Sequence, residues 1–244
     1  MNYAQIAKEA RIKVLDLIFR AQTSHIGSNF SCIDLMSVLF EKIDLDRDKV
    51  ILSKGWAAAS LYYFLWRKGR ITEEELNSYC QPGSKFIGLA EPVVPEIPIS
   101  GGSMGLGFPG AVGIALAKKL KGEEGKVYCL MSDGEMQIGT TWESAMIAAH
   151  HKLDNLVVIV DDNKLQAMGK TDDILKIAWD FAEMFYYPDH YIDGHNYENI
   201  EYVLESSQSC PKFIHANTIK GKGVSFMENN NLYHYKQLSS EEYN

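Results

Sequence analysis

Residues 126–165 read KVYCLMSDGEMQIGTTWESAMIAAHHKLDNLVVIVDDNKL, which predicts a strand–helix–strand unit. Residues 127–131 and 156–160 are short apolar runs typical of buried strands, and residues 141–152 between them are compatible with a helix. A single helical crossover between parallel strands brings their carboxyl ends to the same edge of the sheet. Ligands of open parallel sheets bind at that edge. We therefore expect the chemistry of the chain just past these two strands.

Polar residues follow each of the two predicted strands. Asp133 and Gly134 come after the first strand, and Asn163 comes after the second. Carboxylate, amide and backbone oxygens, the last from Leu165, suit Mg2+, which completes its octahedron with waters and substrate phosphates. Gly134 lacks a Cβ, so its N–H can approach a phosphate closely. Such residues are also common in ordinary strand-end turns, but two clusters at the ends of one unit favour a diphosphate–metal site.

An Asp-Gly pair followed by a spacer and then by Asn after an apolar strand resembles the thiamine diphosphate fingerprint. Residues 132–169 as a whole resemble transketolase, and are similar to the amino-terminal half that two-chain transketolases encode separately. The resemblance runs from about residue 8 to 235 and implies thiamine diphosphate and Mg2+ as cofactors. The implied metal ligands are Asp133, Asn163 and Leu165, and the implied cofactor contacts in this stretch are Asp133, Gly134, Glu135 and Asn163.

Two earlier segments resemble transketolase at positions that meet the cofactor. Residues 24–28, SHIGS, are similar to Gly-His-Pro-Gly-Gly of the family, whose His lies in the substrate channel, so His25 is an expected catalytic residue. Residues 53–57, SKGWA, are similar to Ser-Lys-Gly-His-Ala, whose His contacts the diphosphate. Trp56 keeps one N–H donor at that position but carries no charge. It either contacts the phosphate or fills space.

Two further segments complete the resemblance. Residues 101–107 are similar to the glycine loop that approaches the aminopyrimidine of the cofactor, which implies cofactor contacts for Gly102 and Met104. Residues 218–228, TIKGKGVSFME, lead to His234, which aligns with a family His near the diphosphate and the substrate. His234 is therefore an expected catalytic and cofactor-binding residue. His195 is matched in the family, where it supports the site, and we interpret Lys220 and Lys222 as a solvated basic loop.

Several residues outside the SHIGS segment also depart from the family pattern. Trp56 and Leu89 replace histidines that contact the diphosphate and the sugar donor, and Ile138 replaces a Glu that helps to link two active sites. Ser132 replaces a Gly. The loss of polar groups leads us to expect a specialised enzyme that acts on an unusual ketose or 2-oxo acid.

Composition places the chain in one α/β domain, residues 1–244. We expect a doubly wound, mainly parallel sheet with helices on both faces, since 244 residues with 46% hydrophobic content can bury a full core. The net charge of −8 argues against nucleic acid or an anionic membrane as partner. No apolar run is long enough to span a bilayer. The four cysteines are scattered, which favours a reducing, cytoplasmic compartment.

The remaining elements follow from periodicity and turn signals. We expect helices over residues 3–21, about 31–42 with Ser31 as N-cap, from about 57 to 67, from Thr72, through 115–120 and over 171–184. We expect further strands over residues 49–52, ending near 191–195, and over 212–216.

The resemblance also implies a partner. In the family a Glu from a pyrimidine-binding domain activates the cofactor, and this chain has no such domain. We therefore expect the chain to be inactive alone and to transfer a two-carbon ketol unit between sugars with a separate transketolase carboxy-terminal-half subunit, in an α2β2 assembly. The alternatives are a 2-oxo acid decarboxylase or acyloin-forming subunit, and a non-catalytic scaffold. The presence of both Asp133 and Asn163 argues against the scaffold.

Overall fold

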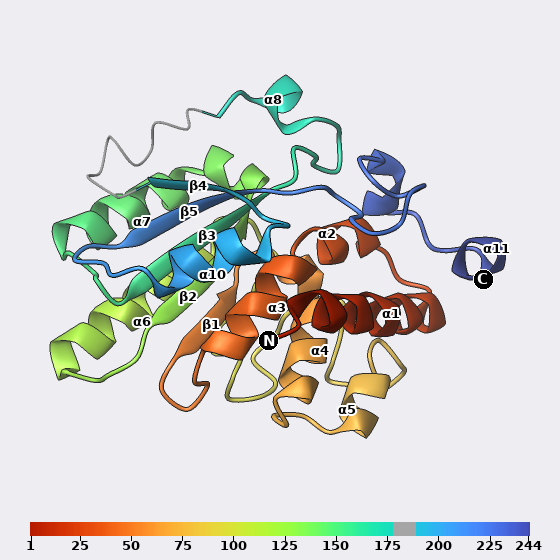
Figure 1. The fold of residues 1–244 in the computed structure, drawn as a ribbon, viewed down its shortest axis with the longest axis horizontal. Coiled ribbons are helices and arrows are strands. Elements are labelled where there is room, and N and C mark those ends of the chain that lie inside the picture. The colour runs from red at the N-terminus through yellow and green to blue at the C-terminus, as the bar shows by residue number, and fades with distance from the viewer. Residues whose placement is uncertain (178–188) are drawn as a thin grey trace.

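A computed structural model describes residues 1–177 and 189–244, and a five-stranded sheet lies at its centre (Figure 1). All neighbouring strands are parallel, which confirms the expected sheet. Their order across the sheet is β1 (Lys49–Leu52), β2 (Val127–Ser132), β3 (Leu156–Asp162), β5 (Lys212–Asn217) and β4 (Asp189–Asp193). The strand–helix–strand unit at residues 126–165 thus supplies two neighbouring strands, β2 and β3, whose ends lie side by side as predicted.

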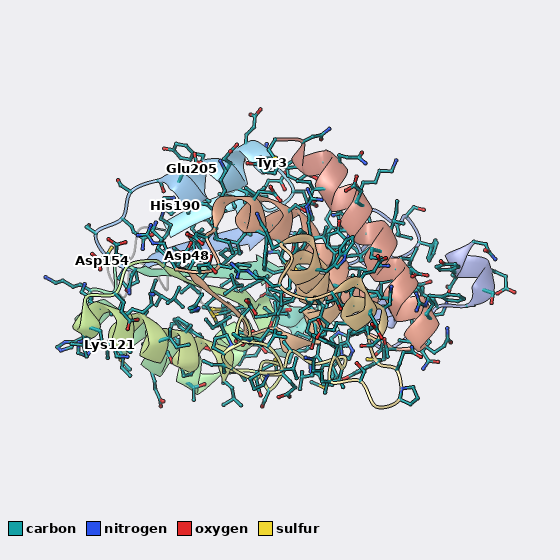
Figure 2. The ribbon with its side chains drawn as sticks, turned by 90° about the horizontal axis from the view of Figure 1, so that it is seen from below. Tyr3, Asp48, Lys121, Asp154, His190 and Glu205 are labelled. Carbon is teal, nitrogen blue, oxygen red and sulfur yellow. The ribbon has the colours of Figure 1, made fainter. Side chains whose placement is uncertain are left out.

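Alternate residues of the strands enter two separate cores, one on each face of the sheet. Val127, Cys129 and Met131 of β2 belong to one core, whereas Tyr128 and Leu130 belong to the other. Helices cover both faces, so the expected doubly wound architecture is confirmed. Figure 2 shows side chains filling both layers, with Lys121 and Tyr3 marking helices on opposite faces.

The first core lies under α1 (Tyr3–Ala21), α2 (Ile26–Ser31), α3 (Ile33–Lys42), α4 (Ala58–Arg67) and α10 (Tyr197–Glu205). The second lies under α6 (Gly107–Lys121) and α7 (Gly139–His150). The short elements are η1 (Gly55–Ala57), α5 (Glu73–Asn77), η2 (Asp133–Gln137), α8 (Thr171–Ile174), η3 (Asn231–His234) and α11 (Ser240–Tyr243). Across the two described ranges, no helix is long and apolar enough to cross a bilayer.

The predicted start of α5 at Thr72 is confirmed by a capping box. The Thr72 hydroxyl accepts a hydrogen bond from the N–H of Glu75 at 3.1 Å, and the Glu75 carboxylate accepts one from the N–H of Thr72 at 2.9 Å. This reciprocal pair satisfies two N–H groups that the first turn of a helix leaves without partners.

Two predicted helices differ from the structure. Ser31 ends α2 and does not cap α3. Its hydroxyl donates to the buried carboxylate of Asp161 at 2.6 Å, and its oxygen accepts a hydrogen bond from the ammonium of Lys54 at 3.2 Å instead of one from an N–H of α3. The segment predicted as helical over residues 171–184 forms only α8, and residues 175–177 are not helical. Residues 178–184 of that prediction lie outside the described part of the chain.

Candidate active site

A cavity of about 420 Å3 lies past the carboxyl ends of β1, β2 and β3, where open parallel sheets bind ligands. It brings together residues from distant parts of the chain. All ten residues that the sequence singled out for the cofactor, the metal or catalysis line it: His25, Trp56, Gly102, Met104, Asp133, Gly134, Glu135, Asn163, Leu165 and His234. It is also lined by residues that the sequence did not assign to the site: Ser28, Ser53, Lys54, Ser132, Gln166, Ala167, Met168 and Tyr235.

Asp133 opens η2 directly after β2, and its carboxylate is buried. One oxygen accepts a hydrogen bond from the N–H of Gly134 at 2.9 Å, and the other accepts one from the hydroxyl of Thr171 at 2.7 Å. Burial raises the pKa of Asp133 to about 6, although the Thr171 bond opposes this. A nearby cation stabilises a buried carboxylate, so the environment of Asp133 fits a metal ligand.

Asn163 and Leu165 form a turn at the end of β3. The side-chain oxygen of Asn163 accepts a hydrogen bond from the N–H of Leu165 at 3.2 Å. Asp133, Asn163 and the Leu165 carbonyl thus offer three kinds of oxygen donor to one cavity, a set that fits Mg2+. The described residues contain no group of three or more His, Cys, Asp or Glu side chains that could hold a metal by themselves.

Gly134 and Gly102 allow the backbone to come close to the cavity. A Cβ on Gly134 would stand 3.2 Å from the side chain of Gln166 and 3.4 Å from the sulfur of Met104. Gly102 has a φ of +107°, and a Cβ there would overlap the side chain of Leu89. Leu89, at the position where the family has a His, therefore packs directly on the glycine loop.

Glu135 is buried, and both carboxylate oxygens are bonded within the protein. One accepts from the hydroxyl of Ser53 and from the N–H of Gly105, and the other accepts from the N–H of Ser132 at 2.9 Å. The Ser132 hydroxyl also donates to Glu135 at 3.3 Å, which gives the departure from the family Gly a structural role. Glu135 therefore ties the ends of two strands to the glycine loop, and burial raises its pKa.

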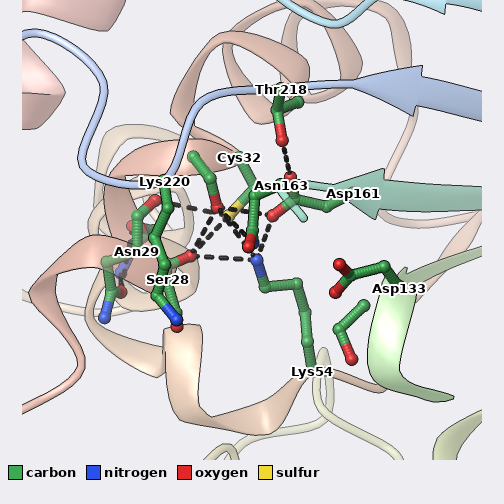
Figure 3. Close-up of polar contacts among 12 residues, drawn as sticks. Ser28, Asn29, Cys32, Lys54, Asp133, Asp161, Asn163, Thr218 and Lys220 are labelled. Carbon is green, nitrogen blue, oxygen red and sulfur yellow. Dashed lines mark hydrogen bonds and ion pairs between the residues drawn. The ribbon is translucent and has the colours of Figure 1, made fainter. Parts of the chain in front are cut away.

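Lys54 and Asp161 form a buried ion pair beside Asp133 (Figure 3). Lys54 also donates to the carbonyl of Ser28 at 2.9 Å, and Asp161 accepts a hydrogen bond from the hydroxyl of Thr218. Burial lowers the pKa of Lys54, but the attraction of Asp161 outweighs it, so the net pKa is raised. The charge of Asp161 is balanced by Lys54 within the protein, whereas Asp133 forms no ion pair with a described residue.

Lys220 corrects the interpretation of residues 218–228 as a solvated basic loop. Its side chain is fully buried, and its ammonium donates to the carbonyl of Leu165 at 3.0 Å and to Nδ1 of His234 at 2.7 Å. Burial, followed by the charge of Lys54, lowers the pKa of Lys220 to about 8. The N–H of Gly221 donates to the carbonyl of Gly27 at 3.0 Å and fixes the loop against α2.

Lys222 behaves differently, because it stays half-buried beside Glu228 at 3.7 Å. The sequence pattern carries no signal that separates these two lysines.

His25 and His234 meet at the cavity. The N–H of His25 donates to the carbonyl of His234 at 3.0 Å, and their ring centroids lie 5.0 Å apart in a T-shaped arrangement. Burial, followed by the charge of Lys220, lowers the pKa of His25 to about 4 and that of His234 to about 3. Both imidazoles are therefore neutral near pH 7.

Trp56 stacks on His25, with ring centroids 4.5 Å apart and planes 13° from parallel. Its side chain is 45% exposed and lines the cavity. Within residues 1–177 and 189–244 its indole N–H makes no hydrogen bond. Contact of that N–H with a phosphate stays a prediction.

His195 lies outside the cavity and supports the loop that carries Lys220. The N–H of Ile219 donates to Nε2 of His195 at 2.8 Å, so the protonated Nδ1 donates to Asp34 at 2.7 Å. Asp34 also accepts hydrogen bonds from Arg11 and Tyr197. Burial raises the pKa of Asp34, but the bonds from His195 and Arg11 outweigh it and hold the pKa at about 2.

Comparison with known proteins identifies the family. Residues 3–244 match the family described as transketolase, thiamine diphosphate binding domain. One of the subunits of the apulose-4-phosphate transketolase of Actinobacillus succinogenes is 34% identical over 265 residues, which cover 99% of this chain and 94% of that protein. The 6-deoxy-6-sulfo-D-fructose transketolase subunit of a Clostridium species is 34% identical over 250 residues, which cover 96% of this chain and 91% of that one.

A solved structure shows the same fold. The crystal structure of transketolase from Campylobacter jejuni superposes with a TM-score of 0.94 at 30% sequence identity. The match covers 99% of this chain and 42% of the Campylobacter chain, so this chain spans about two fifths of that transketolase. The chain therefore belongs to the transketolase family and corresponds to its thiamine diphosphate-binding, amino-terminal part.

Proposed function

We propose that this chain anchors thiamine diphosphate and Mg2+ in a transketolase that transfers a two-carbon ketol unit between sugars. The observation that carries the proposal is the convergence of Asp133, Asn163 and Leu165 on one cavity in a transketolase-family chain. Behind this lining, the buried ammonium of Lys220 is hydrogen-bonded to the Leu165 carbonyl and to His234. When bound, the cofactor supplies a ring that stabilises a carbanion.

The residues of this chain have three roles, which differ in the charge that each residue carries. Asp133, Asn163 and the carbonyl of Leu165 hold Mg2+ through oxygen, as the donor set predicts. Lys220 lies next to the Leu165 carbonyl and offsets the negative charge of a diphosphate. His25 and His234 are neutral near pH 7 and offer hydrogen bonds to substrate oxygens without adding a positive charge.

The cofactor-binding part of the proposal is tested by titrating thiamine diphosphate into the protein with Mg2+ present and then with Mg2+ chelated. Binding that depends on Mg2+ supports the proposal. Absence of binding in the presence of the partner subunit favours the alternative of a non-catalytic scaffold.

A second subunit completes the site in this proposal. Large apolar side chains line the open cavity, with Trp56 45% exposed, Met104 50% exposed and Met168 82% exposed. Exposed apolar surface of this kind suits a protein partner. Several relatives are named as one of the subunits of a transketolase, which implies a second chain in those enzymes. We place residues 1–244 as a single diphosphate-binding domain in an α2β2 assembly with a transketolase carboxy-terminal-half subunit.

This assembly is testable by activity. The chain alone should show no ketol transfer, whereas the mixture of both subunits should. Robust transfer by the chain alone would refute the partner requirement. We place the assembly in the cytoplasm, since the four cysteines are scattered along the sequence without the spacing of a disulfide framework.

The substrate is a specialised ketose in this proposal. Leu89 packs on Gly102 and presents no polar group where the family places a His for the sugar donor. Relatives are named for apulose 4-phosphate and for 6-deoxy-6-sulfo-D-fructose, both unusual ketoses. A panel of branched, sulfonated and ordinary ketose donors, assayed with one aldehyde acceptor, ranks the donors by kcat/KM. Release of CO2 from pyruvate without ketol transfer would instead identify a 2-oxo acid decarboxylase.

A further inference from the structure

Ser24 replaces the Gly that the transketolase pattern has before its active-site His, and the replacement makes a contact. The hydroxyl of Ser24 lies 2.7 Å from Nδ1 of His25. A glycine has no side chain to make this contact, so it distinguishes this chain from the family pattern.

The backbone of His25 is fixed on both sides. His25 has a φ of 69°, a left-handed conformation that only a few per cent of non-glycine residues adopt. Its N–H donates to the carbonyl of His234, and its carbonyl accepts hydrogen bonds from the N–H and the side-chain amide of Asn29 at 3.1 and 3.0 Å. These hydrogen bonds fix the position of the His25 backbone, from which the imidazole extends.

The ring of His25 is also enclosed by aromatic neighbours. One face stacks on Trp56, and the ring makes T-shaped contacts with His234 and Tyr235, the latter with centroids 5.5 Å apart at 83°. Nδ1 is hydrogen-bonded to Ser24, so Nε2 is the remaining polar atom of the ring. Nε2 has no hydrogen-bond partner among the residues that the structure describes, and His25 lines the cavity.

The available acceptors favour one direction for this hydrogen bond, because Nδ1 is the one acceptor that the described residues offer to the Ser24 hydroxyl. Within the described ranges, the Ser24 hydroxyl makes no hydrogen bond other than the one to Nδ1. A hydroxyl that donates to Nδ1 requires the proton of the neutral imidazole to lie on Nε2. We propose that Ser24 is a positioning residue that holds His25 in the Nε2–H tautomer, so that His25 donates a hydrogen bond to a substrate oxygen in the cavity. The substrate part of this inference rests on the proposed function.

The tautomer can be measured without cofactor, partner or turnover. Nitrogen-15 NMR of the full chain, labelled at histidine, distinguishes Nε2–H from Nδ1–H, and a His25→Gln variant assigns the signals. We expect Nε2–H to predominate in the wild type. A net hydrogen bond of this kind changes the tautomer ratio by roughly threefold to tenfold, so Ser24→Ala and Ser24→Gly should shift the ratio toward Nδ1–H by that factor. Ser24→Thr keeps a hydroxyl and should restore the wild-type ratio.

Ser78→Ala is the matched control, because it removes another 2.7 Å hydroxyl contact, to Ser84, from a pair that does not line the cavity. It should leave the His25 signals unchanged. A wild type that is mainly Nδ1–H, or a Ser24→Ala variant with the wild-type tautomer ratio, would overturn the assignment.

Activity of the assembled enzyme tests the substrate part separately. Ser24→Ala should lower kcat/KM for the ketose donor by roughly threefold to tenfold, and Ser24→Thr should recover it. An unchanged kcat/KM in an active assembly overturns the role toward the substrate. If the wild-type assembly transfers no ketol unit at all, the proposed function fails, while the NMR result still decides the tautomer.

Discussion

Replacing Lys220 by Met should stabilise the fold and weaken cofactor binding at the same time. Among the described residues, the buried ammonium of Lys220 has no carboxylate at hydrogen-bond distance, and its hydrogen bonds go to a carbonyl and an imidazole. Such a group costs folding energy and is useful only when an anion binds. Met has a similar length and fills the space without a charge.

The cost of the buried charge follows from its pKa. Burial lowers the pKa of Lys220 from 10.5 to about 8, and about 1.4 kcal/mol per pH unit gives a cost of about 3 kcal/mol at pH 7. The variant also loses two hydrogen bonds, which contribute about 1 kcal/mol each. We therefore expect a net stabilisation of about 1 kcal/mol, which corresponds to a rise in Tm of about 2–4 °C for a chain of this size.

The effect of Lys220→Met on the free energy of cofactor binding is larger than its effect on the free energy of unfolding. For a working separation of about 5 Å between the Lys220 ammonium and one charge of a bound diphosphate, the attraction would be roughly 3 kcal/mol at an effective dielectric constant of about 20. Loss of this attraction should raise the Kd of thiamine diphosphate about 100-fold.

The pH dependence has a definite sign. The folded state of the wild type releases the Lys220 proton near pH 8, and the unfolded state releases it near 10.5. The unfolded state therefore binds more protons between these values, so the free energy of unfolding contributed by this group rises with pH across that window. The advantage of about 1 kcal/mol that Lys220→Met has at pH 7 should therefore vanish within this window and then reverse in sign, because wild type regains about 3 kcal/mol as Lys220 becomes neutral in both states.

Urea unfolding from pH 7 to 10 and calorimetry with thiamine diphosphate and Mg2+ measure both effects. Lys222→Met is the matched control, because Lys222 is half-buried in the same loop and pairs with Glu228. It should change neither quantity appreciably. A Lys220→Met variant that is less stable than wild type at pH 7, or that binds the cofactor equally well, would refute this reasoning.

Two further substitutions test the supports of the site. Gly55→Ala should destabilise the fold by about 3 kcal/mol or prevent folding, because a Cβ there would overlap the backbone of Gly101 and Gly102. Gly113→Ala is the control, because no described atom lies within 4 Å of the added Cβ. Thermal unfolding should show the control to be as stable as wild type or slightly more stable. Asp34→Asn should cost about 2 kcal/mol at pH 7, since the folded pKa of about 2 lies below the value of 3.8 for a free carboxyl. Wild type should lose that advantage as the pH falls from about 4 to 2, whereas the variant should not; equal acid unfolding of both would contradict the role of Asp34.

The sequence predicted which residues gather at the cavity because their positions depend on local rules. Asp133 and Asn163 directly follow apolar strands, and parallel strands on one sheet bring such ends together. Glycines at positions 102 and 134 are needed where the backbone comes close to other groups. These signals depend on residues close in sequence and on the geometry of a single sheet.

The contacts that the sequence missed depend on tertiary packing. Lys220 and Lys222 stand two residues apart in a basic loop, and only the attachment of Gly221 to α2 turns the first inward. Ser31 is a residue type common at N-caps, but its oxygen accepts a hydrogen bond from the buried ammonium of Lys54 and its hydroxyl donates to Asp161. Side-chain direction in loops follows from such long-range bonds, which no local pattern records.

The central claim is that Asp133 anchors the diphosphate of the cofactor through Mg2+. It is tested most directly by calorimetric titration of thiamine diphosphate into the chain assembled with its partner subunit, comparing wild type with Asp133→Asn and with the surface control Asp154→Asn. Wild type and the control should bind with Mg2+ and lose binding in chelator, and Asp133→Asn should bind at least about 100-fold more weakly, in line with the loss of a metal ligand. Equal affinity of Asp133→Asn and wild type, or wild-type binding that does not depend on Mg2+, would contradict the claim.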